Sequence, residues 1–275
     1  MKLAKVFKEN KQFTLFSILA LVVVGVAVFA PQIAPYDPLD AVMLESLQAP
    51  SSAHPFGTDK LGRDLLSRVI FGTRTSLVMT LCLVAVIFVI GTFLGVIAGY
   101  FGGVVDAVIM RIADMMISFP GLVLAIAIAG MLGPNLVNAV ISIAAVSWTK
   151  YARLARSMVL KVKKSLYIEA AVVNGTKTWK ILLVHVLPNM VTQMVVTAAA
   201  DIGTMMLELA SLSFLGFGAT APTPEWGLML NEGRTYMAKA PWLMIYPGIA
   251  IVICVVVFNM LGDSIRDVLD PRQDQ

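Results

Sequence analysis

The sequence predicts an all-α integral membrane protein with six transmembrane helices, and three observations support that prediction. Hydrophobic residues make up 58% of the 275 residues and charged residues only 14%, whereas soluble domains carry about 25% charged residues. The apolar residues form runs about as long as the 20 helical residues that cross a bilayer. The basic residues lie between those runs, which fits membrane orientation better than nucleic-acid binding despite the net charge of +4.

Five uncharged runs account for the six helices, because one run is long enough to hold two. That run, residues 115–149, is broken by Gly133-Pro134-Asn135, which is typical of a tight turn. Another run, residues 75–105, is longer than one span needs. The expected helices cover residues 13–31, 77–100, 114–132, 136–151, 182–206 and 242–263.

The orientation follows from the distribution of Lys and Arg, which concentrate in cytoplasmic loops. With a cytoplasmic N-terminus, fifteen of the 21 basic residues fall in inner segments and six in outer ones. Both termini are therefore expected in the cytoplasm. The first apolar run exceeds the core of about 7–15 residues in a secretory signal, and Pro31 would hinder cleavage after it. We expect this run to stay as an anchor.

This topology divides the chain into four parts. Residues 1–31 form a cytoplasmic tail and the first anchor, and residues 32–74 form an extracytoplasmic segment. Residues 75–265 form a five-helix core that contains a short cytoplasmic helix at about residues 165–180, and residues 266–275 form a cytoplasmic tail.

Two features predict local geometry within the spans. Gly91, Gly95 and Gly99 recur every four residues on one helical face, where small residues let another helix approach closely. Pro188 lacks a backbone N–H and is expected to bend the fifth helix near its inner start.

Two acidic residues are candidates for a translocation path. Asp201 and Glu208 are seven residues apart, which places them on one face of the fifth helix, toward its outer end. Charged residues within spans usually face a cavity or a partner. The two residues therefore form an acidic lining for a cationic substrate, or they pair with other helices or lie exposed at the membrane interface.

No metal site is expected in the chain. The two histidines, His54 and His185, belong to no Cys/His cluster, and thioethers are poor ligands for divalent nickel. Cys82 and Cys254 lie inside apolar runs, so they are expected to be small buried hydrophobic residues rather than a disulfide or a metal pair.

The basic inner segment before the fifth helix carries the clearest functional signal. Residues 165–180 predict a short, Ala-rich helix outside the membrane, which Ser165 could cap and which Gly175 breaks. Such a compact helix between two spans can dock into a groove of a partner. Alternatively, the segment is an interfacial loop whose lysines extend along the membrane surface.

The same segment resembles the EAA motif of ABC importer permeases. Glu169-Ala170-Ala171 is followed after three residues by Gly175, and after nine more by His185-Val186-Leu187-Pro188, with His185 where that family has Ile. In that family the motif forms a coupling helix in a cleft of the ATPase subunit. The resemblance implies a type I ABC importer permease fold, in which Glu169, Ala170, Ala171 and Gly175 make the coupling contact.

Three further stretches narrow the resemblance to the C-type permeases of dipeptide, oligopeptide and nickel ABC importers. They are residues 54–64 with 67–68 and 72–77, residues 212–216 with 223–227, and residues 258–263 with parts of 266–272. The resemblance covers nearly the whole chain. It implies a location in the inner membrane of a bacterial cell, a B-type permease partner in a heterodimer, two ATP-binding subunits and an extracytoplasmic solute-binding protein.

The outer segment adds three charged candidates, Asp59, Arg63 and Asp64. Salt bridges among them could hold an outer cap over the bundle, or they could contact the substrate directly. Arg63 and Glu225 are also candidates for touching the protein that delivers the substrate. The spacing of these residues does not choose between the roles.

The function indicated is that of a permease subunit through which small peptides or nickel, free or chelated, enter the cytoplasm. No cofactor or catalysis is expected in the chain, because it lacks a Gly-x-x-x-x-Gly-Lys-Ser/Thr phosphate loop; partner subunits would use ATP and Mg²⁺. An ion-coupled secondary transporter is the alternative, and a membrane enzyme is a weaker one. The substrate stays open, although residues 201–206 look slightly more like the nickel branch.

Overall fold

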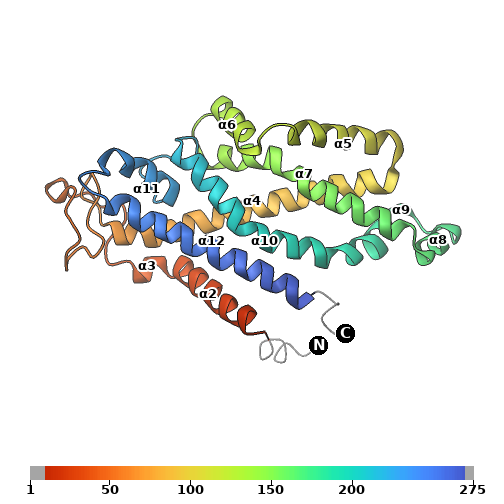
Figure 1. Ribbon diagram of the computed structural model, residues 1–275, viewed down its shortest axis with the longest axis horizontal. Helices are drawn as coiled ribbons and strands as arrows, with labels where there is room; N and C mark the ends of the chain where they lie inside the picture. The colour runs from red at the N-terminus through yellow and green to blue at the C-terminus, as the bar shows by residue number, and fades with distance from the viewer. Residues whose placement is uncertain (1–9, 270–275) are drawn as a thin grey trace.

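The computed structural model describes residues 10–269 and shows an elongated helical bundle (Figure 1). In this range η1 and η3 are 3-10 helices and η2 is a π-helix. The elements in chain order are α2 (Lys11–Val28), α3 (Ala30–Ile33), η1 (Met43–Glu45), α4 (Leu65–Phe101), α5 (Gly103–Ile117), α6 (Gly121–Leu132), α7 (Leu136–Lys163), α8 (Leu166–Val173), α9 (Thr178–Lys180), η2 (Ile181–Val186), α10 (Leu187–Phe214), α11 (Trp226–Gly233), η3 (Arg234–Tyr236) and α12 (Trp242–Leu269).

The two ends of the bundle carry different elements (Figure 1). The loops of residues 34–64 and α11 lie at one end, and α8 and α9 lie at the other. α2 packs along α12, and the start of α2 and the end of α12 are directed toward the α8 end. The long helices α4, α7 and α10 run along the bundle toward the α8 end, and α12 starts at the α11 end, so that each end is assembled from segments far apart in the sequence.

Within residues 10–269, four stretches are long and apolar enough to cross a membrane: α2, α4, α12 and the continuous stretch from α9 through α10. A fifth is added if the bent pair α5 and α6 counts as one span. α7 is not among them although it has 28 residues, because its second half is basic. The all-α membrane class is confirmed, whereas the count of six spans is not confirmed on length and hydropathy.

The predicted third span is wrong in shape. Instead of one helix over residues 114–132, α5 ends at Ile117 and α6 begins at Gly121, with an angle of 93° between them. Pro120 lies in this break, and proline both lacks an N–H and disfavours helical backbone at the residue before it. The turn at residues 133–135 is confirmed, and the Asn135 side chain accepts a hydrogen bond from the N–H of Val137 (2.7 Å).

α4 begins at Leu65 rather than at residue 77, so the expected boundary between residues 74 and 75 falls inside this helix. Asp64 caps it, because the carboxylate accepts a hydrogen bond from the N–H of Ser67 (2.7 Å). Ser67 and Arg68 are buried. A search for uncharged runs misses these first turns, because tertiary partners make polar residues tolerable there.

The other long helices also extend past their predicted ends, to Lys163, Phe214 and Leu269. The tail expected at residues 266–275 therefore begins inside α12, and its remainder lies outside the described residues. Four of the basic residues used for the orientation also lie outside the described residues, namely Lys2, Lys5, Lys8 and Arg272.

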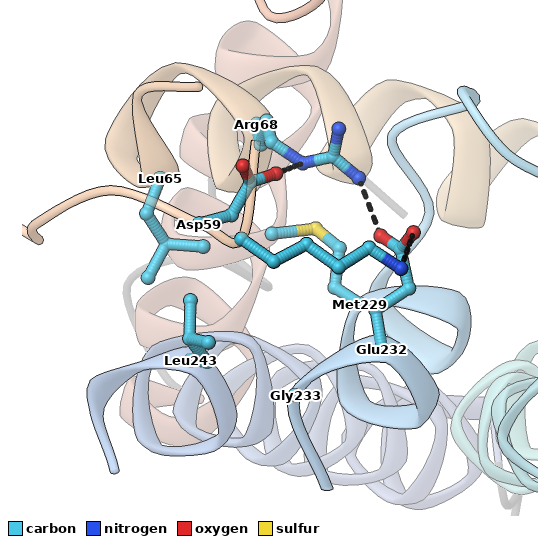
Figure 2. A pocket seen from close by; sticks show the side chains of 8 residues that line it. Asp59, Leu65, Arg68, Met229, Glu232, Gly233 and Leu243 are labelled. Carbon is cyan, nitrogen blue, oxygen red and sulfur yellow. Dashed lines mark hydrogen bonds and ion pairs between the residues drawn. The ribbon is translucent and has the colours of Figure 1, made fainter. Parts of the chain in front are cut away.

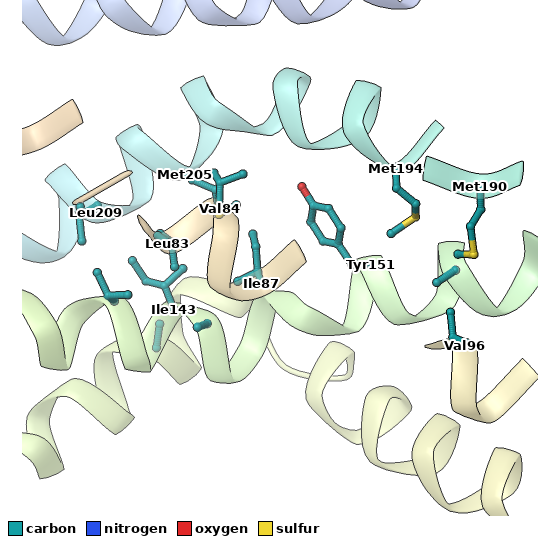
Figure 3. Packing of buried hydrophobic residues seen from close by; sticks show 14 of the residues in the cluster. Leu83, Val84, Ile87, Val96, Ile143, Tyr151, Met190, Met194, Met205 and Leu209 are labelled. Carbon is teal, nitrogen blue, oxygen red and sulfur yellow. The ribbon is translucent and has the colours of Figure 1, made fainter. Parts of the chain in front are cut away.

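α4 and α7 pack at close range along one face of α4, as the glycine spacing predicts. A Cβ atom at Gly91 would lie 2.5 Å from the Cβ of Tyr151, and one at Gly99 would lie 2.9 Å from the Cβ of Val159. Carbon atoms in ordinary contact are about 3.5–4.0 Å apart, so glycine is required at this interface. The prediction is confirmed, and α10 closes the same apolar core from the other side (Figure 3).

Directly before Leu187, next to Pro188, the structure has the π-helix η2, while the bend predicted at Pro188 stays a prediction. Proline offers no N–H to the carbonyl four residues earlier, and a π-turn is one way in which a helix accommodates such a break. The Asn189 side chain donates a hydrogen bond to the carbonyl of His185 (2.6 Å). This side chain therefore satisfies one backbone group near the break.

The bundle exposes apolar side chains along its length, for example Leu21 and Val22 on α2, as expected where lipid is the solvent. Cys254 is buried as predicted, but Cys82 is exposed on α4, so the expectation of burial is wrong for Cys82. Its position on the outer face of α4 explains the difference.

Candidate functional site

An ion-pair network joins the outer segment to the bundle at the end that carries α11. Arg63 and Arg68 are each 1% exposed. Arg63 Nε lies 2.6 Å from Asp59 Oδ2, and Arg68 Nη2 lies 3.1 Å from Glu232 Oε2. Arg68 Nε lies 3.5 Å from Asp59 Oδ2, so Arg68 sits between the two carboxylates (Figure 2). Lys60 adds a third cation, 3.2 Å from Glu232 Oε1.

Asp64 fixes the end of the same segment to α4. Its Oδ2 accepts hydrogen bonds from both the N–H and the hydroxyl of Ser67, each at 2.7 Å, and its Oδ1 lies 2.9 Å from His54 Nδ1. Gly62 has a φ of 76°, and a Cβ atom there would overlap the carbonyl oxygen of Val42. The loop is therefore closely packed as well as ion-paired.

The three charged candidates of the outer segment, Asp59, Arg63 and Asp64, are thus buried and engaged with protein partners. This geometry is that of a cap, and contact with a substrate stays a prediction. The sequence pattern did not indicate Glu232, because it lies on α11 in a stretch without clear periodicity. Only the folded chain brings it next to Arg63 and Arg68.

The first residues of α11 hold that helix on α4. Glu225 accepts hydrogen bonds from the N–H groups of Gly227 (2.9 Å) and Leu228 (2.8 Å), and the Trp226 indole donates to the carbonyl of Val69 (3.0 Å). Burial raises the pKa of the Glu225 carboxyl, and the two N–H groups partly oppose that rise. Because Glu225 is buried, it presents no surface to a delivering protein in this conformation.

A cavity of about 360 Å³ opens between the α5–α6 bend, α7 and α10. Its ionisable lining residues are Lys150, Tyr151, Asp201 and Glu208. α10 continues to Phe214, so the placement of Asp201 at the outer end of this helix is wrong and Asp201 lies in its interior. Within residues 10–269 no group of three or more His, Cys, Asp or Glu side chains could hold a metal ion.

Asp201 links α10 to α7 across the cavity wall. Its Oδ2 accepts a hydrogen bond from the Tyr151 hydroxyl (2.9 Å), and its Oδ1 accepts one from Lys150 Nζ (2.6 Å). Asp201 is buried, whereas the Lys150 side chain is 60% exposed. Asp201 therefore pairs two helices, while Glu208 makes no hydrogen bond or ion pair within the described part of the chain and faces the cavity.

Sequence patterns did not single out Lys150 and Tyr151 as site residues, because Lys150 entered only the count that gives the orientation. The available signal was that the helical pattern of residues 136–151 runs on without a Gly or Pro. The expected helix ended at these two residues, whereas α7 continues to Lys163 and holds both in its interior, where they contact Asp201 on α10.

α8 forms an exposed tip at the opposite end of the bundle (Figure 1). Ile168 is buried and anchors the helix, while Glu169 and Ala170 are exposed and Ala171 is half-buried. Apolar side chains also face outward: on α8, Leu166 is 83% and Val173 86% exposed. An exposed apolar patch with polar neighbours marks an interaction surface.

Gly175 ends α8 for a stereochemical reason. Its φ is 71°, its N–H donates to the carbonyl of Val172 (3.0 Å), and the N–H of Thr176 donates to the carbonyl of Ala171 (3.0 Å). These two bonds define a Schellman motif, in which a glycine follows the helix in the left-handed region. Ser165 is the N-cap residue of α8, as the sequence suggested, but its hydroxyl donates to the carbonyl of Val162 (2.6 Å) and makes no side-chain capping bond.

An all-helical membrane bundle with a charged cavity and an exposed helix between two long helices has the architecture of a transporter subunit. Residues 91–275 match the family described as "Binding-protein-dependent transport system inner membrane component". Residues 2–50 match the "N-terminal TM domain of oligopeptide transport permease C". The chain belongs to this family of inner membrane transport components.

Individual relatives agree with the family. The dipeptide transport system permease protein DppC of Alkalihalophilus pseudofirmus is 42% identical over 268 residues, which cover 98% of this chain and 88% of that protein. The glutathione transport system permease protein GsiD of Pectobacterium atrosepticum is 45% identical over 253 residues, covering 92% and 84%. A probable D,D-dipeptide transport system permease protein, DdpC of Escherichia coli, is 41% identical over 271 residues, covering 98% and 91%.

Among solved structures, a chain of the inward-facing MetNI methionine ABC transporter matches with a TM-score of 0.57 and 20% identity, covering 73% of this chain and 95% of that one. This likeness shows the fold, which is that of type I ABC importer permeases. The resemblance to C-type permeases is confirmed. The chain is a permease subunit of an ABC importer and is not itself an enzyme, as its relatives show.

Proposed function

We propose that this chain forms half of the membrane pathway of an ABC importer for short peptides. Its partners are a B-type permease, two ATP-binding subunits and an extracytoplasmic solute-binding protein, and the ATP-binding subunits hold ATP and Mg²⁺. The relatives described above are named for dipeptide, D,D-dipeptide or glutathione transport. These names support peptides, and they give no support to the lean toward nickel.

The observation that carries the proposal is the exposed tip α8. Leu166 and Val173 present apolar surface beside the small residues Ala170 and Ala171, which allow a partner to approach the helix backbone. Burying one such large apolar side chain contributes about 1.5–3 kcal/mol. An ATP-binding subunit whose cleft covers both of these side chains would therefore bind α8 firmly, and Glu169 at the rim of that cleft would orient the helix.

The position of α8 in the chain makes it suited to transmit motion. α7 leads directly into α8, and α9 and η2 lead from it into α10. Asp201 binds α10 to Lys150 and Tyr151 on α7 at the cavity. A partner that moves α8 would thereby move the two helices that form the cavity wall, because the three segments are joined by short connections.

The orientation that fits this role places the α8 end in the cytoplasm and the α11 end outside. Basic residues flank α8 on both sides, at Lys161, Lys163 and Lys164 before it and at Lys177 and Lys180 after it, as expected of a cytoplasmic loop. The start of α2 and the end of α12 are directed toward the same end (Figure 1). Both termini are therefore cytoplasmic in this proposal.

The cavity lined by Asp201 and Glu208 is the candidate translocation path. It is only partly enclosed by this chain, and a second permease subunit would complete it. Its acidic side chains favour solutes that carry a positive group, such as the amino terminus of a peptide.

Uptake measurements test the proposal. Cells that contain all partner subunits, with and without this chain, are given a labelled dipeptide or labelled nickel; we expect dipeptide uptake to require the chain and nickel uptake not to. Loss of nickel uptake alone would contradict the peptide substrate. Dipeptide uptake that survives ATP depletion would contradict the ATP-driven mechanism and favour ion-coupled transport, which no observation on this chain otherwise favours.

A further inference from the structure

The cavity wall carries charges of both signs. Lys150 on α7 and Glu208 on α10 line the same cavity, so a cation lies on this wall beside the acidic side chains. The arrangement of these two groups defines which solutes the wall can recognise, and this inference rests on the peptide importer proposed above.

The hydrogen bonds leave one cation and one anion available to a solute. Both oxygens of Asp201 are occupied, by the Tyr151 hydroxyl and by Lys150. Lys150 uses one of its three donors on Asp201, and its side chain is 60% exposed. Glu208 has no hydrogen-bond or ion-pair partner among residues 10–269. The cavity therefore offers spare donors at Lys150 and a free carboxylate at Glu208.

The spacing of these groups suits a short peptide. The Lys150 ammonium lies beside Asp201 of α10. Glu208 lies seven residues after Asp201 on the same helix, which is about 10 Å along the helix axis. Helical side chains lean toward the N-terminus, so the Glu208 carboxylate lies somewhat nearer to the level of Asp201. Two or three extended residues span about 7–10 Å. The volume of about 360 Å³ also lies in the range of about 300–1,000 Å³ for small-molecule pockets.

We propose that Lys150 binds the terminal carboxylate of a zwitterionic di- or tripeptide and Glu208 binds its amino terminus. The peptide carboxylate accepts a hydrogen bond from one of the spare donors of Lys150, and Asp201 keeps its bond to Tyr151. No proton or covalent bond is transferred. A bare divalent cation fits this wall poorly, because the ammonium of Lys150 repels it.

The test combines variants of the site with peptides blocked at one end. The assembly of this chain with its partner subunits is purified in nanodiscs without the solute-binding protein, so that only the membrane site selects. Binding of Ala-Ala, N-acetyl-Ala-Ala and Ala-Ala-amide is measured by saturation-transfer NMR. For the unaltered assembly we expect blocking of either end to weaken binding about tenfold or more, because each block removes a charged hydrogen bond.

Each variant of the site is expected to change the selectivity for only one end of the peptide. Glu208→Gln is expected to abolish the discrimination against N-acetyl-Ala-Ala while keeping that against Ala-Ala-amide, and Lys150→Met is expected to do the reverse. Asp263→Asn and Lys239→Met, which alter exposed residues outside the cavity, should leave both discriminations unchanged.

The outcomes separate this inference from the function it rests on. Binding of Ala-Ala with the same discrimination in all variants would overturn the assignment of Lys150 and Glu208 but leave the peptide importer standing. Absence of any Ala-Ala binding to the unaltered assembly would overturn the site at Lys150 and Glu208, whereas the peptide importer itself would be overturned only if dipeptide uptake in cells did not require the chain. Loss of both discriminations in a single variant would point to collapse of the cavity and would also contradict the separate roles.

Discussion

The Tyr151 hydroxyl on α7 donates a hydrogen bond to Asp201 on α10 across 2.9 Å. Tyr151 is fully buried in the apolar core shared by α4, α7 and α10, and its hydroxyl points toward α10 (Figure 3). Within residues 10–269, every side-chain hydrogen bond between α7 and α10 involves Asp201. This contact therefore holds together the two helices that flank α8.

Removing the Tyr151 hydroxyl should weaken the contact between α7 and α10 without leaving a cavity in the apolar core. Tyr151→Phe keeps the ring and is expected to lower the stability of the assembly by about 0.5–1.7 kcal/mol, the range for buried polar contacts between membrane helices. Thermal unfolding of the purified assembly measures the change. Tyr100→Phe is the matched control, since the Tyr100 hydroxyl makes no hydrogen bond in the described residues. An equal shift in both variants would contradict a specific role for the Tyr151–Asp201 bond.

The outer cap should depend on both of its arginines. Arg63→Met removes a cation that is 1% exposed and leaves Asp59 with a weaker partner, so we expect a loss of about 3–5 kcal/mol. Arg234→Met, at an exposed position, is the control and should change little. Protease sensitivity of the outer segment should rise in the first variant only; equal sensitivity in both would argue against the cap.

The close approach of α4 and α7 can be tested with a single methyl group. A Cβ atom at Gly95 would lie 2.7 Å from the Cβ of Ala155, so Gly95→Ala should destabilise the assembly by about 1–3 kcal/mol through overpacking. Gly25→Ala meets no atom within 4 Å and should be neutral or stabilising by up to about 1 kcal/mol. Thermal unfolding of the two variants compares them, and a stable Gly95→Ala protein would contradict the packing.

Glu225 should make stability fall as the pH rises. Burial raises the pKa of its carboxyl in the folded protein above the ordinary value of about 4.3. Between those two pKa values the folded state holds a proton that the unfolded state has lost, so each rise in pH favours unfolding. Glu225→Gln keeps an oxygen for the N–H groups of Gly227 and Leu228 and should remove this dependence. Unfolding curves of both proteins from pH 4 upward would contradict the assignment if their difference stayed constant.

Local sequence patterns predicted those features whose cause is local. The four-residue spacing of Gly91, Gly95 and Gly99 indicated the α4–α7 contact, and Gly133-Pro134-Asn135 indicated the turn before α7. The α8 segment was predicted because its helix and the break at Gly175 are both encoded in adjacent residues.

Most of the missed features depend on partners distant in the chain. Ser67 and Arg68 belong to α4 because Asp64 accepts a hydrogen bond from Ser67 and Glu232 accepts one from Arg68. Glu232 lies far from Arg68 in the sequence. The sequence places Asp201 on one helical face, but its partner Lys150 lies on another helix, α7. Only the packing of α7 against α10 brings the two residues together. The bend at Pro120 was hidden because the run around it carries no charge.

The central claim is that α8 couples this permease to ATP hydrolysis, and the most direct measurement is ATP-driven dipeptide uptake by an assembly with Glu169→Lys. Reversing the charge of an exposed residue on the proposed contact should cut uptake by more than about tenfold, because a misplaced charge at an interface costs several kcal/mol. Membrane abundance of the chain should not change. Asp263→Lys, an equal charge reversal at an exposed residue of α12, should leave uptake intact. Undiminished uptake in the Glu169→Lys assembly would contradict the coupling role of α8.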